Sequence, residues 1–260
     1  MYSSADDEQE INAINEVFLV QKQAFERQSY LSAQTRIDDL QTLKCSLLKH
    51  QEVLVQALSK DFGCRSVDDS KMGDLMPTIM GISYAIKHIK KWMKPSKRHV
   101  GMLFQPAKAF VMYQPLGVVG IITPWNYPVF LSLGPLTTAL AAGNRAMIKM
   151  SEFTPATNEV IKKIINDVFP SNKVAVINGG PDVAAHFSAQ PFDHLIFTGS
   201  TRVGKIVMAA AAKNLTPVTL ELGGKSPTII DNKIDINDTV SRFILGTTLN
   251  AGQTCVAPDY

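Results

Sequence analysis

The sequence has 260 residues, of which 45% are hydrophobic and 19% are charged, a composition typical of a globular protein that buries a core. Its net charge of +3 is too small to favour nucleic acid or an anionic membrane as a partner. The three cysteines, Cys45, Cys64 and Cys255, are odd in number and widely spaced. This spacing argues against a disulfide framework or a zinc site and favours a reducing, cytoplasmic location.

Neither export nor membrane insertion is indicated by the apolar patterning. The first ten residues, MYSSADDEQE, are acidic and lack the apolar core of a secretory signal. The segment between Lys108 and Arg145 carries no charge, but four prolines interrupt it, so it contains no clean span of about 20 apolar residues. We expect this segment to form buried core.

The first third of the chain predicts two helices. Apolar residues recur with a period close to 3.6 over residues 33–60, which predicts one amphipathic helix that closes at Asp61-Phe62-Gly63. A second helical pattern covers residues 72–92 and ends in a run of lysines around Trp92. Cations suit a helix C-terminus, so this run favours a solvated helix end, with phosphate binding as the alternative.

From residue 110 onward, short apolar runs alternate with helical patterns. Helices are expected at 128–143, 154–169, 182–188 and 201–213, the second of them capped by Thr154. This alternation predicts an α/β domain with a mainly parallel, Rossmann-like sheet and flanking helices. The expected strands are FVMYQ, VVGII, AMIKM, KVAVI, HLIFT and PVTLEL.

A glycine-rich turn follows the strand HLIFT in the stretch FTGSTRVGKIV. Gly199, Gly204 and Lys205 match the P-loop pattern, but Ile206 stands where that pattern needs a hydroxyl to hold magnesium. A nucleotide-hydrolysing P-loop is therefore disfavoured. Phosphate binding stays open, because backbone N–H groups at the start of a helix attract anions.

Polar side chains also stand at other strand ends, each with a structural alternative. TPWNYP holds Asn126 between two prolines, where it presents an amide or caps a helix. KMSE pairs Lys149 with Glu152, which bind a ribose or form a surface ion pair. In ELGGKSP, Glu221 precedes two glycines, where its carboxylate is a general base or a structural residue of the turn. Cys255, in GQTC, is by itself a buried small residue, half a disulfide, a metal ligand or a nucleophile.

Taken in order, the motifs PLGVVGIITPWNYP, KMSE, FTGSTRVG, ELGGKSP and NAGQTC resemble those of the aldehyde dehydrogenase superfamily over nearly the whole chain. KMSEFTP and GQTCVAPDY resemble most the class 3 branch, and particularly its coniferyl aldehyde dehydrogenases. Arg202 departs from the acidic or small residue of many members, which bears on cofactor affinity.

The resemblance implies a covalent oxidation of an aldehyde, aromatic and coniferyl-like or of medium to long chain, to the carboxylic acid. Cys255 would attack the carbonyl as a thiolate, and Asn126 with the backbone N–H of Cys255 would stabilise the oxyanion. Hydride transfer to the cofactor would leave a thioester. Glu221 would act as the general base for the water that hydrolyses it.

The resemblance also implies NAD as cofactor, with NADP as the alternative. Lys149 and Glu152 would bind the adenosine ribose, and Ser200 the pyrophosphate. No metal is expected. The expected cofactor-binding residues are Ile122, Thr123, Pro124, Trp125, Lys149, Glu152, Thr198, Gly199, Ser200, Gly204, Leu222 and Gly223.

By the same resemblance, residues 1–222 form a cofactor domain, with an oligomerisation arm at about 97–115, and residues 223–260 begin a catalytic domain that continues in the family. The full-length protein is expected to be a homodimer. We expect Cys255 to lie in a frayed terminus and the 260-residue chain to turn over aldehyde poorly. The alternative function is a catalytically silent dinucleotide-binding or interaction module.

Overall fold

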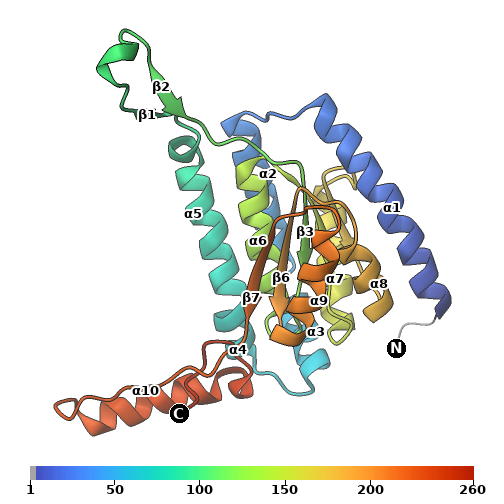
Figure 1. Ribbon diagram of the computed structural model, residues 1–260. Helices are drawn as coiled ribbons and strands as arrows, with labels where there is room; N and C mark the ends of the chain where they lie inside the picture. The colour runs from blue at the N-terminus through green and yellow to red at the C-terminus, as the bar shows by residue number, and fades with distance from the viewer. Residues whose placement is uncertain (1–3) are drawn as a thin grey trace.

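The computed structural model describes residues 4–260, which fold into three layers, a sheet between two sets of helices (Figure 1). The α/β fold predicted from the sequence is confirmed. The helices are α1 (Ser4–Arg27), α2 (Ala33–Lys49), α3 (Gln51–Phe62), α4 (Val67–Ser70), α5 (Met76–Trp92), α6 (Pro128–Ala142), α7 (Pro155–Val168), α8 (Pro181–Ser188), α9 (Thr201–Ala212) and α10 (Ile236–Thr248).

The central sheet has five parallel strands in the order β5-β4-β3-β6-β7. The chain builds outward from β3 to β4 and β5 on one side, then returns to the other side for β6 and β7. Open α/β sheets bind ligands where the strand order reverses, at the carboxyl ends of the strands. The strands are β3 (Val118–Ile122), β4 (Arg145–Lys149), β5 (Val174–Ile177), β6 (His194–Gly199) and β7 (Val218–Leu222).

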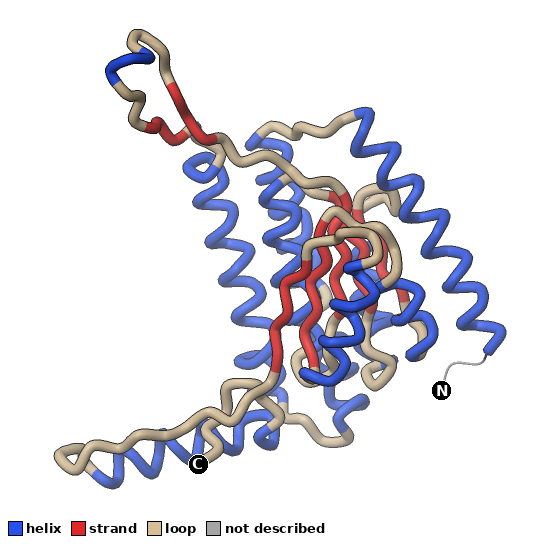
Figure 2. The backbone as a smooth tube through the Cα atoms, in the orientation of Figure 1, coloured by secondary structure: helices blue, strands red, loops and turns tan. Residues whose placement is uncertain are grey.

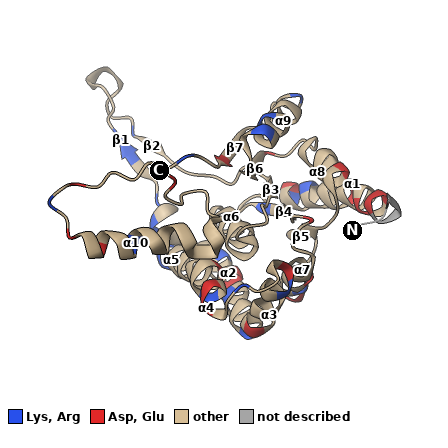
Figure 3. Cartoon of the chain, turned by 90° about the horizontal axis from the view of Figure 1, so that it is seen from below, with Lys and Arg blue, Asp and Glu red and all other residues tan. Residues whose placement is uncertain are grey.

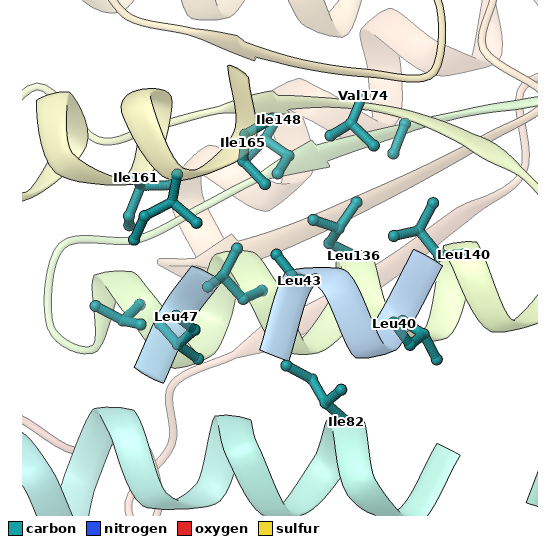
Figure 4. Close-up of a cluster of buried hydrophobic side chains, with 14 of the residues drawn as sticks. Leu40, Leu43, Leu47, Ile82, Leu136, Leu140, Ile148, Ile161, Ile165 and Val174 are labelled. Atoms are coloured by element: carbon teal, nitrogen blue, oxygen red, sulfur yellow. The ribbon is translucent and has the colours of Figure 1, made fainter. Parts of the chain in front are cut away.

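The side chains of alternate strand residues pack in two separate cores, because successive side chains point to opposite faces of a sheet. On one face, α6 and α7 pack on the sheet, and α2, α3 and α5 pack against these two helices; buried aliphatic side chains such as Leu43 and Ile148 join them in one core (Figure 4). On the other face, α1, α8 and α9 pack through Ile14, Phe187 and Val207. Burial on both faces explains why β3, β4 and β5 read as continuous apolar runs.

The first part of the chain departs from the sequence-based expectation in two places. The single helix expected over residues 33–60 is two helices, because the chain breaks at His50 between α2 and α3. Helix α1 has no counterpart in the expectation, although Ile11, Ile14 and Phe18 recur along it at helical spacing and pack in the second core. The expected end at Gly63 is confirmed, and its φ of 79° favours glycine.

Two segments project from the body of the molecule (Figure 2). One is the antiparallel hairpin of β1 (Ser96–Arg98) and β2 (Ala109–Val111), whose tip carries the exposed residues Met102, Leu103 and Phe104. The strand expected at 110–114 is thus one edge of this hairpin. The other is α10, which carries few charged side chains (Figure 3) and leaves Phe243 and Ile244 exposed.

The cap of α7 comes from a distant residue instead of Thr154, whose side chain makes no capping bond. Asp61, at the end of α3, accepts the backbone N–H of Ala156 at 3.0 Å and of Thr157 at 2.7 Å, one on each carboxylate oxygen. A carboxylate at this end also interacts favourably with the helix dipole. Asp61 therefore ties α3 to the helix that follows β4.

Replacement of Asp61 by alanine is expected to lower the free energy of unfolding by about 1 kcal/mol, because two helix N–H groups lose their acceptor. Asp61→Asn keeps one acceptor oxygen, so it should lower the free energy of unfolding by less. Urea unfolding measures both, with Glu16→Ala on the exposed side of α1 as the control. Equal losses for Asp61→Ala and Glu16→Ala would contradict the capping role.

Candidate functional site

A wide cleft of about 1650 Å³ opens at the carboxyl ends of the parallel strands. It exceeds the usual size of a small-molecule pocket, about 300–1,000 Å³, and it continues along the groove between α5 and α6. Asn126, Glu221 and Cys255 all line it. Residues from three distant parts of the sequence therefore face one space.

Asn126 follows β3 in a turn that contacts the segment just before Cys255. Its side-chain amide donates to the carbonyl of Gln253 at 2.9 Å, and the amide of Asn250 donates to the Asn126 carbonyl at 2.9 Å. The hydroxyl of Tyr127 lies 2.6 Å from that of Thr254. An amide carries two N–H donors, so Asn126 keeps one beyond its bond to Gln253.

The loop before Cys255 has an unusual backbone. Asn250, Ala251 and Gly252 have φ values of 51°, 55° and 77°, the left-handed region. Such residues cost of order 1–3 kcal/mol each when they are not glycine, and they persist where neighbouring contacts hold them. Here the holding contacts are the bonds to Asn126 and the bond from the Gln253 side chain to the Asn250 carbonyl.

The end of the chain is also held, contrary to the frayed terminus that the sequence led us to expect. Asp259 N–H donates to the Ser226 carbonyl at 2.9 Å, and Thr228 N–H donates to the carbonyl of Tyr260. Lys225 pairs with the Asp259 carboxylate at 2.9 Å. Cys255 is thus exposed in the cleft between two anchored segments.

Glu221 lies at the end of β7, opposite Thr198 of β6 in the parallel register. Its side chain is exposed and faces the cleft. Gly223 and Gly224 follow Glu221 after one residue. A Cβ added to either glycine would meet no atom within 4 Å, so there is free space around the backbone beside Glu221. A carboxylate in this position can accept a proton from a water in the cleft.

The glycine turn between β6 and α9 is closely packed. A Cβ on Gly199 would lie 2.5 Å from the Phe197 ring, and one on Gly204 would lie 2.9 Å from Leu222. Ser200 caps α9 by accepting the N–H of Val203 at 3.3 Å. This helix start faces the cleft through Thr198, Gly199 and Ser200, and it suits an anion.

Lys149 ends β4 in full burial, with its side-chain nitrogen donating to the carbonyls of Met150 and Gly179 at 2.7 Å each. Burial lowers its pKa to about 8, while the nearby carboxylates of Glu152, Asp7 and Glu10 act in the opposite direction. The ammonium form has three donors, so one remains beyond these two bonds among the described residues.

The remaining expected cofactor residues fall into two groups. Pro124, Trp125, Leu222 and Gly223 line the cleft together with the glycine turn. Ile122, Thr123, Lys149, Glu152 and Gly204 do not line it; Ile122 and Thr123 are buried at the end of β3. The Thr123 hydroxyl is buried without a hydrogen-bond partner in the described part of the chain.

A nucleotide fits these observations of the site. The closely packed glycine turn at a helix start is suited to the pyrophosphate of a dinucleotide. The orphaned hydroxyl of Thr123 and the spare donor of Lys149 stand at the neighbouring strand ends, buried behind the cleft, and are suited to hydroxyl groups. No group of three His, Cys, Asp or Glu side chains within residues 4–260 is arranged to hold a metal ion. Nor is any helix in this range both long and apolar enough to cross a bilayer.

Sequence reasoning gave no role to four residues at or behind the Asn126 turn. Gln253 and Thr254, within the NAGQTC motif, and Arg65 contact the turn, and Asp74 contacts the start of α6. Arg65 and Asp74 lie far from Asn126 in the sequence, so only the fold identifies them.

Comparison with known proteins decides the family. The sequence model described as "Aldehyde dehydrogenase family" matches residues 4–259, nearly the whole chain. The chain belongs to the aldehyde dehydrogenase family. The resemblance seen in its motifs is thereby confirmed, including the class 3-like character.

Among aldehyde dehydrogenases, the chain is related to coniferyl aldehyde dehydrogenases. It is 55% identical to a "Probable coniferyl aldehyde dehydrogenase" of Pseudomonas aeruginosa, over 97% of this chain and 53% of the relative. It is 45% identical to the "Coniferyl aldehyde dehydrogenase" of Pseudomonas sp. strain HR199, over 92% of this chain and 49% of the relative. The chain thus spans about half the length of these relatives.

Solved aldehyde dehydrogenase structures share the fold. Staphylococcus aureus AldH, in a substrate-bound state, matches with a TM-score of 0.91 and 39% identity, over 95% of this chain and 54% of that one. PnpE from Pseudomonas sp. WBC-3, in complex with nicotinamide adenine dinucleotide, matches with a TM-score of 0.85 and 30% identity. The match covers 95% of this chain and 50% of PnpE. Homologues of this family therefore bind NAD.

Proposed function

We infer that this chain carries the cofactor site and the nucleophile of an NAD(P)-dependent aldehyde dehydrogenase. The observation that supports this most is the meeting of Asn126, Glu221 and Cys255 in one cleft, at the strand ends where α/β sheets bind ligands. The family membership and the relation to coniferyl aldehyde dehydrogenases agree with it. An aromatic, coniferyl-like aldehyde is the proposed substrate, with medium or long-chain aldehydes as the alternative.

The first half of the reaction is assigned to Cys255 and Asn126. The Cys255 thiolate adds to the aldehyde carbonyl and forms a thiohemiacetal. Its oxyanion accepts the backbone N–H of Cys255 and the free N–H of the Asn126 amide, which the bond to Gln253 holds in place before the reaction. Bound NAD supplies a hydride acceptor, so loss of hydride from the tetrahedral carbon leaves a thioester on the sulfur.

The second half is assigned to Glu221. Its carboxylate takes a proton from a water that attacks the thioester carbonyl, the carboxylic acid forms, and the Cys255 thiolate leaves. The exposed position of Glu221 in the cleft gives it access to such a water. The open backbone at Gly223 and Gly224 leaves it room to move.

The cofactor is assigned to the strand ends and the glycine turn. Ser200 and the start of α9 would bind the pyrophosphate, and Lys149 with Glu152 the adenosine ribose. The negative charge of Glu152 disfavours the extra phosphate of NADP, so NAD is proposed as the preferred cofactor.

The division at residue 222 and the homodimer are also proposed. The sheet ends with β7, and residues 223–234 leave it before α10 begins. The projecting hairpin, with its exposed apolar tip, is the proposed oligomerisation arm. If the 260-residue chain proves inactive, a silent dinucleotide-binding module is the alternative. The exposed aliphatic side chain of Ile206, unable to hold magnesium, speaks against a P-loop hydrolase.

Calorimetric titration of the chain with NAD tests the cofactor site directly. We expect NAD to bind, magnesium-ATP to bind more weakly, and Glu152→Gln and Ser200→Ala each to weaken NAD binding, because each removes an assigned contact. The exposed Glu16→Ala serves as the matched control. Equal affinity for magnesium-ATP would contradict the proposal and favour the P-loop alternative.

The same titration has an expected pH dependence. Below pH 8 Lys149 is an ammonium with a third donor for the ribose; above pH 8 it is an amine whose two donors are already used by carbonyls. NAD affinity should therefore be level below about pH 8 and fall above it. Lys149→Met should abolish this fall, whereas the exposed Lys163→Met should retain it. An affinity that does not change up to pH 9.5 would contradict the assignment of Lys149.

A further inference from the structure

A buried ion pair lies directly behind the Asn126 turn. Arg65 Nη1 and Asp74 Oδ2 are 2.7 Å apart, and the side chains are only 2% and 0% exposed. Burial raises the pKa of Asp74 to about 6, while Arg65 and two backbone N–H groups act in the opposite direction. Buried ion pairs add little net stability, since apolar side chains of similar size often serve as well. A gain in stability therefore does not explain why an ion pair is buried behind the Asn126 turn.

Asp74 holds the start of α6, the helix that follows the Asn126 turn. Its Oδ1 accepts the N–H of Val129 at 3.1 Å and of Phe130 at 2.8 Å. Tyr127, at the capping position of α6, makes no side-chain cap of its own. Asp74 thus replaces the missing cap, and it reaches this position from a π-helical turn over Lys71–Leu75, a feature frequent at functional sites.

Arg65 holds the turn itself. Its guanidinium carbon lies 4.9 Å from the ring centre of Phe62 and 5.0 Å from that of Tyr127, so the cation sits against two aromatic rings. Its Nη1 also lies 3.5 Å from the Asn126 carbonyl. Gly73 makes room for this arrangement, because a Cβ there would lie 2.7 Å from the Tyr127 ring.

Two of the residues that Arg65 contacts, Asn126 and Tyr127, also hold the cysteine loop. Asn126 binds Asn250 and Gln253, and Tyr127 binds Thr254. The loop has left-handed residues at 250–252 and so depends on outside contacts to keep its shape. An unbroken series of contacts therefore leads from Asp74 and Arg65 to the residue beside Cys255.

We propose that Arg65 and Asp74 are positioning residues that fix the Asn126 turn and, through it, the loop that presents Cys255. The pair touches neither Cys255 nor the cleft residue Glu221; it acts through Asn126, Tyr127 and the start of α6. The inference rests on the proposed function only in calling this loop catalytic. The positioning itself is a property of the folded chain.

Amide hydrogen exchange tests the inference on the 260-residue chain. The variant Arg65→Met with Asp74→Asn removes both charges but keeps an oxygen that can accept from Val129 and Phe130. We expect its thermal midpoint to stay within about 5 °C of the parent. The hydrogen-bonded amides of Gln253 and Ala257 should exchange about tenfold faster or more, while those of β4 stay unchanged.

Two further variants make the result decisive. Lys173→Met with Asp39→Asn removes another partly buried pair, joined by a short hydrogen bond next to β5, and should leave the loop amides protected. Arg65→Lys keeps a cation for Asp74 but cannot match the planar stacking, so intermediate exchange is expected. If the double variant does not fold, the exchange rates of the Gln253 and Ala257 amides in Arg65→Lys test the proposal instead.

Loop amides that stay fully protected in a folded variant would overturn the proposal. So would an equal acceleration at every amide, which would show a purely structural role. The measurement needs neither aldehyde nor cofactor. A failure of the chain to bind NAD would leave this inference standing, and protected loop amides would leave the proposed function standing.

Discussion

Replacement of Cys255 by serine is expected to lower aldehyde-dependent NADH formation by about 10⁴-fold or more, the scale seen when covalent enzymes lose their nucleophile. The physical reason is that a hydroxyl ionises far less readily than a thiol and adds poorly to a carbonyl. The measurement uses a chimera that joins this chain to the part of the Pseudomonas aeruginosa relative beyond the match. Coniferyl aldehyde and NAD are the substrates, and absorbance of NADH is the readout.

The other two thiols provide the control. Cys45 and Cys64 are exposed, and neither lines the cleft. Cys45→Ser and Cys64→Ser should each keep the rate within about twofold, as surface substitutions usually do. A Cys255→Ser chimera that retains a tenth of the rate would show that the reaction does not pass through this sulfur.

Asn126→Ala in the same chimera is expected to lower kcat by about 10²–10³-fold, the usual cost of one lost oxyanion donor. The substitution also removes the bond to the Gln253 carbonyl, so part of the loss could come from a displaced loop. KM should change less than kcat, because the oxyanion exists only after the thiolate has added.

Tyr127→Phe separates the two contributions. It removes the hydroxyl that contacts Thr254 but leaves the Asn126 amide in place. We expect kcat to fall by less than about tenfold, because this variant displaces the loop but keeps the oxyanion donor. If Tyr127→Phe costs as much as Asn126→Ala, the amide is not an oxyanion donor and the turn matters only for holding the loop.

The parallel sheet could be predicted from the sequence because its strands are short, continuous apolar runs separated by helices. β3 and β4 are buried on both faces, and such strands need no context to be recognised. The same pattern locates Asn126, Glu221 and Ser200 at strand ends, but it leaves a structural alternative open for each of them. Their roles are implied by the resemblance of the motifs to the aldehyde dehydrogenases and not by the strand pattern.

What could not be predicted depends on contacts between distant residues. The cap of α7 comes from Asp61, about a third of the chain away, whereas local rules point to Thr154. The break at His50 leaves the apolar spacing of α2 and α3 almost in phase, so periodicity does not reveal it. The Arg65–Asp74 pair has no sequence signal, because its importance lies in what it touches.

The bond between Asn126 and Gln253 joins residues 127 positions apart in the sequence. During synthesis the strands of the sheet emerge from the ribosome well before Cys255, and chains fold from the N-terminal side as they emerge. The strand-end side of the cleft can therefore form on the nascent chain before Cys255 has emerged. Cys255 would take its place in the cleft only later, when the loop closes onto the Asn126 turn, so the cleft is completed by a contact that the sheet has to wait for.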